Sequence, residues 1–177
     1  TKIVGYIPVY KGLKQSIDNA QLNKLTHINI SFLNPDINGV LLHGNVMACM
    51  PNDTNENITR SELNYAVNKI HQAGAKVLIS LGGGTLPHCA GNWPKLLAPE
   101  NRNSLVSNLL RFVDKFNLDG LDIDIEGAVL TQVDKSGNYM PFIKSLSFGL
   151  KKRKKLLTAA TASYEGGSVP ISSLPYF

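Results

Sequence analysis

Three carboxylates occupy alternate positions in the second half of this 177-residue sequence. Asp122, Asp124 and Glu126 alternate with aliphatic residues in the run DGLDIDIE at positions 119–126. Side chains alternate between the two faces of a β-strand, so the three acids share one face. A parallel sheet flanked by helices usually buries both faces and keeps both apolar. Three acids on such a strand therefore indicate a functional site.

Closely spaced carboxyls suit acid–base chemistry. Burial and mutual repulsion prevent all of them from ionising and push their pKa values apart. One group can then hold a proton while a neighbour stays charged. The alternative is an exposed edge strand with a solvated acidic face, which the apolar opposite face and apolar flanking strands disfavour.

The elements that position these acids follow a repeated strand-then-helix pattern. A Thr59-x-x-Glu62 capping box begins one helix, which we expect to stop at Gly74. The segment 34–57 is too long for an ordinary connection and could carry a small hairpin at Gly39–His43. Strands are predicted at 3–9, 26–33, 76–81, 118–125 and 156–161, and further helices at 18–24, from 99 to 116, and at 140–153.

This alternation predicts an α/β protein built from parallel βαβ units. Five such strands fit either a doubly wound sheet or part of a (β/α)8 barrel, and periodicity alone does not choose. The glycines after the third strand, in SLGGG at 80–84, lack the spacing of a nucleotide-binding loop.

Four short motifs in the expected order resemble family 18 glycoside hydrolases. The run 119–126 is similar to the family signature D-G-x-D-x-D-x-E, and Ser80-Leu-Gly82-Gly83 resembles its S-x-G-G motif at the end of the third strand. Gly5-Tyr6 and Ser31-Phe32 lie where the family carries an aromatic-bearing first strand and an apolar second strand. The matches extend over essentially the whole chain.

The resemblance implies a TIM barrel with its site at the carboxyl ends of the strands. Only about the first five β/α units are present, so residues 1–177 are expected to form a single partial catalytic domain. The missing barrel half would come in cis or in trans. Because an isolated five-stranded sheet leaves two open edges, this stretch alone is expected to be poorly soluble or oligomeric and nearly inactive.

The resemblance also implies a substrate-assisted retaining mechanism on β-1,4 linkages at N-acetylglucosamine, without cofactor or metal. Glu126 would protonate the leaving oxygen and later activate water. Asp124 would orient the substrate's acetamido group, and Asp122 would share a proton with Asp124.

Substrate-binding residues are expected around these acids. Tyr6 could hydrogen-bond a carboxylate or line the sugar pocket, or it could be an amphipathic core residue, and these alternatives stay open. Trp93 follows the third strand and is expected to stack on a sugar face. Ser80 has no nucleophile-elbow motif around it and is not expected to attack the substrate. The other expected substrate-binding residues are Phe32, Ser80, Gly82 and Gly83.

The expected substrate is chitin or chitooligosaccharides, and the enzyme would be extracellular or secreted. Ile125 and Gly127 around Glu126 resemble plant-type chitinases and endo-β-N-acetylglucosaminidases, so an N-glycan core remains an alternative. A non-catalytic chitinase-like sugar-binding protein is disfavoured, because such members typically lose the motif glutamate.

Composition argues against other partners. The net charge of +5 includes the block Lys151–Lys155, which we interpret as a helix C-terminus on the far face of the barrel, not a nucleic-acid surface, because no aromatics interleave with it. No run approaches the roughly 18 apolar residues of a membrane span. No Cys or His pair has metal-site spacing. Whether Cys49 and Cys89 pair stays open.

Overall fold

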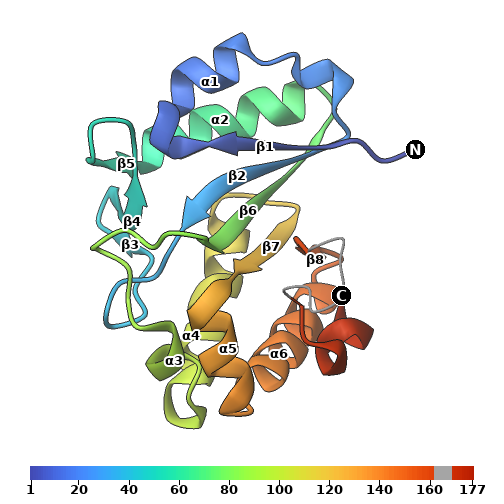
Figure 1. Ribbon diagram of the computed structural model, residues 1–177. Coiled ribbons are helices and arrows are strands. Elements are labelled where there is room, and N and C mark those ends of the chain that lie inside the picture. The colour runs from blue at the N-terminus through green and yellow to red at the C-terminus, as the bar shows by residue number, and fades with distance from the viewer. Residues whose placement is uncertain (162–168) are drawn as a thin grey trace.

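The computed structural model describes residues 1–161 and 169–177. Its main sheet has five parallel strands in the order β1-β2-β6-β7-β8, which is also their order along the chain (Figure 1). This arrangement confirms the α/β prediction and chooses the barrel-type alternative, because each strand is added next to its predecessor. The sheet does not close, since β1 and β8 lie at its two ends. Its strands are β1 (Val4–Pro8), β2 (His27–Leu33), β6 (Lys76–Gly83), β7 (Gly120–Ile125) and β8 (Leu156–Ala159).

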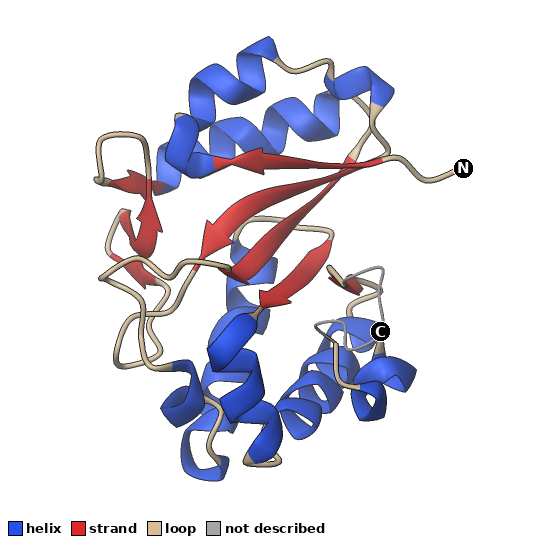
Figure 2. Ribbon diagram, in the orientation of Figure 1, coloured by secondary structure: helices blue, strands red, loops and turns tan. Residues whose placement is uncertain are grey.

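Helices connect the strands and cover the sheet (Figure 2). Two of them, α1 and α2, lie beside β1, whereas α4, α5 and α6 lie beside β7 and β8 (Figure 1). The helices are α1 (Leu13–Asn19), α2 (Arg60–Gln72), α3 (Trp93–Leu96), α4 (Pro99–Lys115), α5 (Gly127–Lys135) and α6 (Tyr139–Lys152), with 3-10 turns at Val9–Lys11, Leu22–Lys24 and Ile171–Tyr176.

The long segment after β2 forms a second, antiparallel sheet in the order β3-β4-β5. The expected hairpin exists, but its strands lie later than predicted. The strand β3 (Leu42–His43) pairs with β4 (Val46–Pro51), and β5 (Asn57–Thr59) adds a third strand that the sequence did not predict. We call this sheet, residues 42–59, the arm.

Three helices departed from the sequence predictions, among them the four-residue α3, which was not predicted. The first helix was expected at 18–24, but α1 begins at Leu13, where Leu13 and Ile17 form a buried i, i+4 pair; only a 3-10 turn occupies 22–24. The helix α5 was missed, because it buries just Leu130 and Val133 and so gives a weak periodic signal.

The helix α2 begins and ends as predicted. The Thr59 hydroxyl accepts a hydrogen bond from the Glu62 backbone N–H at 3.2 Å, and the Glu62 carboxylate accepts one from the Thr59 N–H at 2.7 Å. Gly74 follows with φ = +82°, a left-handed conformation that favours glycine.

The two faces of the main sheet differ in chemistry. The face toward the helices is aliphatic and fully buried, with Ile28, Ile30, Val77, Ile79 and Leu121 at its centre. The opposite face carries polar side chains at one level, because the strand register aligns Ser31 with Ser80, Ser80 with Asp122, and Asp122 with Thr158. This polar row is the base of the candidate site.

The basic block lies where it was predicted, away from this row. Lys151 and Lys152 form the last turn of α6, and Arg153 pairs with Asp114 of α4 at 3.0 Å. Among the described residues, no helix is long and apolar enough to cross a membrane.

The open edges lead to a first prediction. Residues 1–177 expressed alone are expected to self-associate, because β1 presents an unpaired edge with Val4 and Tyr6 about half exposed (53% and 45%). Size-exclusion chromatography with light scattering should show species larger than a monomer. A Val4→Lys variant, which adds an edge charge, should raise the monomer fraction. A monodisperse, active monomer of the unmodified chain contradicts the prediction.

Candidate active site

The three acids are graded in exposure along β7 and the residue after it. Asp122 is 1% exposed and Asp124 is 9% exposed, whereas Glu126 is exposed and is the N-cap residue of α5. The row thus runs from the interior of the sheet to its carboxyl edge. Only its outermost member is freely accessible to a large substrate.

Asp122 accepts hydrogen bonds from side chains of three other strands. The Tyr6 hydroxyl of β1 and the Ser80 hydroxyl of β6 donate to its Oδ2 atom at 2.8 and 2.7 Å. The Thr158 hydroxyl of β8 donates to Oδ1 at 2.6 Å. Tyr6 therefore has the first of its expected roles, binding a carboxylate. Sequence reasoning missed Thr158, whose only signal was an inward position on the fifth strand.

Asp124 is the acid with a perturbed pKa. Burial raises the pKa of Asp124 to about 7, and a hydrogen bond with Glu126 and the charges of Glu126 and Asp122 add to the effect. Near neutral pH a proton is therefore available on Asp124, in hydrogen-bond contact with the exposed Glu126. Burial, followed by the charge of Asp122, also raises the pKa of Tyr6, so Tyr6 stays a neutral hydrogen-bond donor.

The first acid of the run has a different position. Asp119 precedes β7 and lies at the other end of the sheet, where its Oδ2 atom accepts a hydrogen bond from the Val77 N–H at 2.9 Å and pairs with His71 at 2.8 Å. It fastens α2 and β6 to β7. Within residues 1–161 and 169–177, no three Cys, His, Asp or Glu side chains form a metal-binding group.

The glycines at the end of β6 allow close approach to the acids. Gly82 and Gly83 have φ values of +98° and +101°. A Cβ atom on Gly82 would lie 2.8 Å from the Asp124 carbonyl oxygen, and one on Gly83 would lie 2.9 Å from the Phe32 ring. Larger residues would push this strand end away from β7. Asn34, which the sequence reasoning missed, holds the Gly82 carbonyl with its Nδ2 atom at 3.0 Å.

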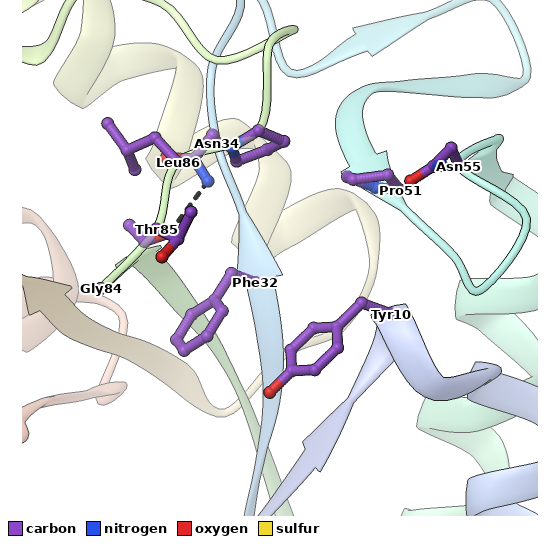
Figure 3. Close-up of a pocket in the computed structure, with 10 residues that line it drawn as sticks. Tyr10, Phe32, Asn34, Pro51, Asn55, Gly84, Thr85 and Leu86 are labelled. Atoms are coloured by element: carbon purple, nitrogen blue, oxygen red, sulfur yellow. Dashed lines mark hydrogen bonds between the residues drawn. The ribbon is translucent and has the colours of Figure 1, made fainter.

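A pocket of about 490 Å³ opens at this end of the sheet (Figure 3). Tyr10 and Phe32 line it as a stacked pair, with ring centroids 6.5 Å apart and planes 11° apart. Gly84 lies beside the acids, since a Cβ atom there would be 3.5 Å from the Glu126 carboxylate. The lining residues are Tyr10, Phe32, Asn34, Pro51, Asn55, Gly82, Gly84, Thr85, Leu86 and Pro87.

The expected substrate-binding residues therefore divide into groups. Phe32 and Gly82 line the pocket. Tyr6 and Ser80 do not line it and instead donate hydrogen bonds to Asp122, and Gly83 packs against Phe32. Tyr10 was missed because it follows the first strand in a 3-10 turn, outside any motif.

The expectation for Trp93 is corrected. Trp93 is 1% exposed, its ring lies edge-on to Phe142, and its Nε1–H donates to the Asn34 Oδ1 atom at 2.8 Å. A buried ring offers no face to a sugar. Its contact with Asn34 instead supports the end of β6.

The two cysteines form a disulfide bond between Cys49 of β4 and Cys89 of the loop after β6, with Cα atoms 5.4 Å apart. Pro51 and Asn55 of the arm form one side of the pocket, and Thr85–Pro87 of the loop form another. The disulfide therefore ties two pocket walls together.

Comparison with known proteins agrees with this geometry. The family model described as glycosyl hydrolases family 18 matches residues 2–172. Chitinase Chi52 of Paenibacillus xylanexedens is 30% identical over 79% of this chain and 26% of its own length, and exochitinase 1 of Streptomyces olivaceoviridis is 34% identical over 53% and 15%. The crystal structure of the GH18 chitinase ChiB of Flavobacterium johnsoniae has 30% identity and a TM-score of 0.74, covering 99% of this chain and 51% of that one. The chain thus spans about half the length of that structure.

Breaking the disulfide should destabilise the protein. It closes a loop of 40 residues, for which loop entropy gives an upper limit of about 4 kcal/mol in the free energy of unfolding. Thermal unfolding with and without reductant should show a lower midpoint on reduction. A Cys49→Ser/Cys89→Ser double variant should have the lower midpoint and no response to reductant. Two free thiols in the native protein would contradict the bond.

The raised pKa of Asp124 predicts a pH-dependent stability. The folded pKa of about 7 exceeds the unfolded value of about 3.9, so the neutral form stabilises the fold below about pH 4 and this contribution is lost as pH rises through about 7. Urea unfolding from pH 4 to 8 should show that an Asp124→Asn variant gains stability relative to wild type as pH rises. Parallel curves for the two proteins would refute this assignment.

Proposed function

Because this chain belongs to glycosyl hydrolase family 18, we propose that it supplies the acid-bearing part of a glycosidase that cleaves β-1,4 linkages at N-acetylglucosamine in chitin or chitooligosaccharides. The observation that carries this proposal is the position of Glu126. It is exposed at the carboxyl end of β7, beside a pocket, and in contact with the proton-bearing Asp124. A general acid must reach the substrate and receive a proton, and Glu126 is both exposed and in contact with the protonated Asp124.

The proposed chemistry uses the substrate's own acetamido group as nucleophile. Glu126 gives its proton to the glycosidic oxygen while the bond from that oxygen to the anomeric carbon breaks. The acetamido oxygen attacks the same carbon and forms a cyclic, positively charged intermediate. The Glu126 carboxylate then takes a proton from water, whose oxygen attacks the anomeric carbon and reopens the ring with retained configuration.

The two inner acids support this sequence. Asp124 turns toward the acetamido group, orients it and stabilises the positive charge that develops there. Asp122 shares a proton with Asp124, which allows the inner pair to hold the proton while Asp124 is charged. All groups named in these steps belong to the chain or the substrate, so the proposal includes no cofactor.

The stacked rings of Tyr10 and Phe32 suit a sugar polymer. Aromatic rings present broad apolar surfaces to ligands, and polar groups such as the Thr85 hydroxyl and the Asn55 amide lie around this pair. We place the sugar units next to the scissile bond over these rings. Further contacts, and the remaining strands of the barrel in cis or in trans, lie outside residues 1–177, which form a single partial catalytic domain in this proposal.

An extracellular or secreted location fits the same proposal. Disulfides such as Cys49–Cys89 persist in oxidising compartments and are rare in reducing ones. Chitin is also an extracellular polymer. The alternative substrate, an N-glycan core, rests on Ile125 and Gly127, which flank Glu126.

Replacing Glu126 tests the proposal. In the full-length protein, Glu126→Gln should lower kcat on chitooligosaccharides by about 100-fold or more while substrate binding persists, because the amide keeps the shape but has no proton to give. Hydrolysis rates and calorimetric binding measure the two effects. Glu100→Gln on the exposed first turn of α4 is the matched control and should keep wild-type activity. Binding without turnover by both wild type and the Glu126→Gln variant would support a sugar-binding protein instead.

A further inference from the structure

The two carboxylate oxygens of Asp122 accept different numbers of hydrogen bonds. The Oδ2 atom accepts hydrogen bonds from both Tyr6 and Ser80. The Oδ1 atom accepts one, from the Thr158 hydroxyl at 2.6 Å. Thr158 is therefore the sole hydroxyl donor to Oδ1 among the described residues. It belongs to the sheet strand farthest from Tyr6.

We propose that Thr158 is a positioning residue that decides whether Asp122 or Asp124 holds the shared proton, and thereby sets the pH range of hydrolysis. This inference rests on the proposed function, in which that proton moves within the pair. It adds a residue of β8 to a site otherwise built from β1, β2, β6 and β7.

The direction of the hydrogen bond carries the argument. A hydroxyl that donates to a carboxylate stabilises its charged form, and the same hydroxyl must turn and accept if the carboxyl gains a proton at that oxygen. Because Oδ2 already accepts two hydrogen bonds and Oδ1 accepts one, Oδ1 is the oxygen with more capacity to bind a proton. While Thr158 donates, the charge stays on Asp122 and the proton stays on Asp124.

Among the described residues, no cationic side chain competes with Thr158 in stabilising the charge of Asp122. In the part of the chain that the structure describes, Asp122 forms no ion pair with Lys, Arg or His. Three hydroxyls donate to it and Asp124 lies nearby, so donated hydrogen bonds are the main stabilisation of its charge. The hydroxyls of Tyr6, Ser80 and Thr158 donate to it, and Asp124 is its acidic neighbour along β7. Asn29 of β2 lies in register with Tyr6, and Glu126 contacts Asp124. Burial, followed by the charges of Asp134 and Asp122, raises the pKa of Tyr139 of α6.

The backbone fixes Thr158 in this position. Gly120 begins β7, and a Cβ atom there would lie 2.2 Å from the Leu156 carbonyl oxygen. Glycine thus lets β8 approach closely, and the Leu156 N–H donates to the Asp119 carbonyl at 2.8 Å. The resulting register sets Thr158 opposite Asp122. Strand pairing therefore places the Thr158 hydroxyl beside Asp122, and no long, flexible side chain is required.

The test compares Thr158→Val, which keeps the shape and removes the hydroxyl, with Thr158→Ser, which keeps the hydroxyl, in the full-length protein. Losing one donor to a charged carboxyl should move the pH–rate limb of the Asp122–Asp124 pair up by about one pH unit in the Val variant. We expect the pH profile of kcat on chitooligosaccharides to move by the same amount, with KM within about twofold. The Ser variant should resemble wild type.

A second measurement does not depend on hydrolysis. Carboxyl carbon NMR titrations should show the same upward shift in the pKa of the Asp122–Asp124 pair in the Val variant. This shift is expected even if wild type cleaves no chitooligosaccharide. Lack of cleavage would overturn the proposed function alone. An unshifted titration and an unshifted pH profile in the Val variant overturn the role of Thr158. So does a Ser variant whose titration and pH profile shift as far as those of the Val variant, because the hydroxyl would then not be the cause. If the Val variant fails to fold, Thr158→Ala replaces it.

Discussion

A carboxyl group held inside a parallel sheet is the constraint on which the rest of this structure depends. Asp122 is almost fully buried, and a buried charge is costly unless hydrogen bonds stabilise it. Those bonds come from β1, β6 and β8, so one side chain requires three strands to keep their register with β7. A one-residue slip of any of them would turn its hydroxyl to the aliphatic face and leave the acid with too few donors. The polar row and the strand register therefore support each other.

The same constraint explains the glycines and the neighbouring supports. Strands that converge on one acid approach closely, and glycine at positions 82 and 120 leaves the necessary space. The end of β6 then needs other restraints, which Asn34 supplies by bridging the Gly82 carbonyl and the Trp93 indole. Outside this core, the disulfide joins the arm to the loop after β6. Rigidity thus extends from the buried acid to the pocket walls.

Local sequence patterns predicted the features that depend on local chemistry. Runs of β-branched residues located all five strands of the main sheet, and the Thr59–Glu62 pair located the start of α2. Alternation placed the acids on one face. The failures share a different cause, because α5, the third strand of the arm and the burial of Trp93 depend on tertiary packing. Trp93 was assigned by residue type and loop position, and neither shows whether a ring faces solvent or Phe142.

Thr158 shows why the site itself was only partly predictable. The motif residues are close in sequence or carry recognisable spacing, whereas Thr158 lies 36 residues beyond Asp122 and gains its meaning from strand pairing. Once the register is known, the exposure gradient gives each acid a distinct environment. The innermost acid is fixed by hydroxyls, the middle one holds a proton because burial raises its pKa to about 7, and the outermost one faces solvent. Three chemically similar side chains on one strand can thus differ in protonation and access, because their depth in the sheet and not their type sets both.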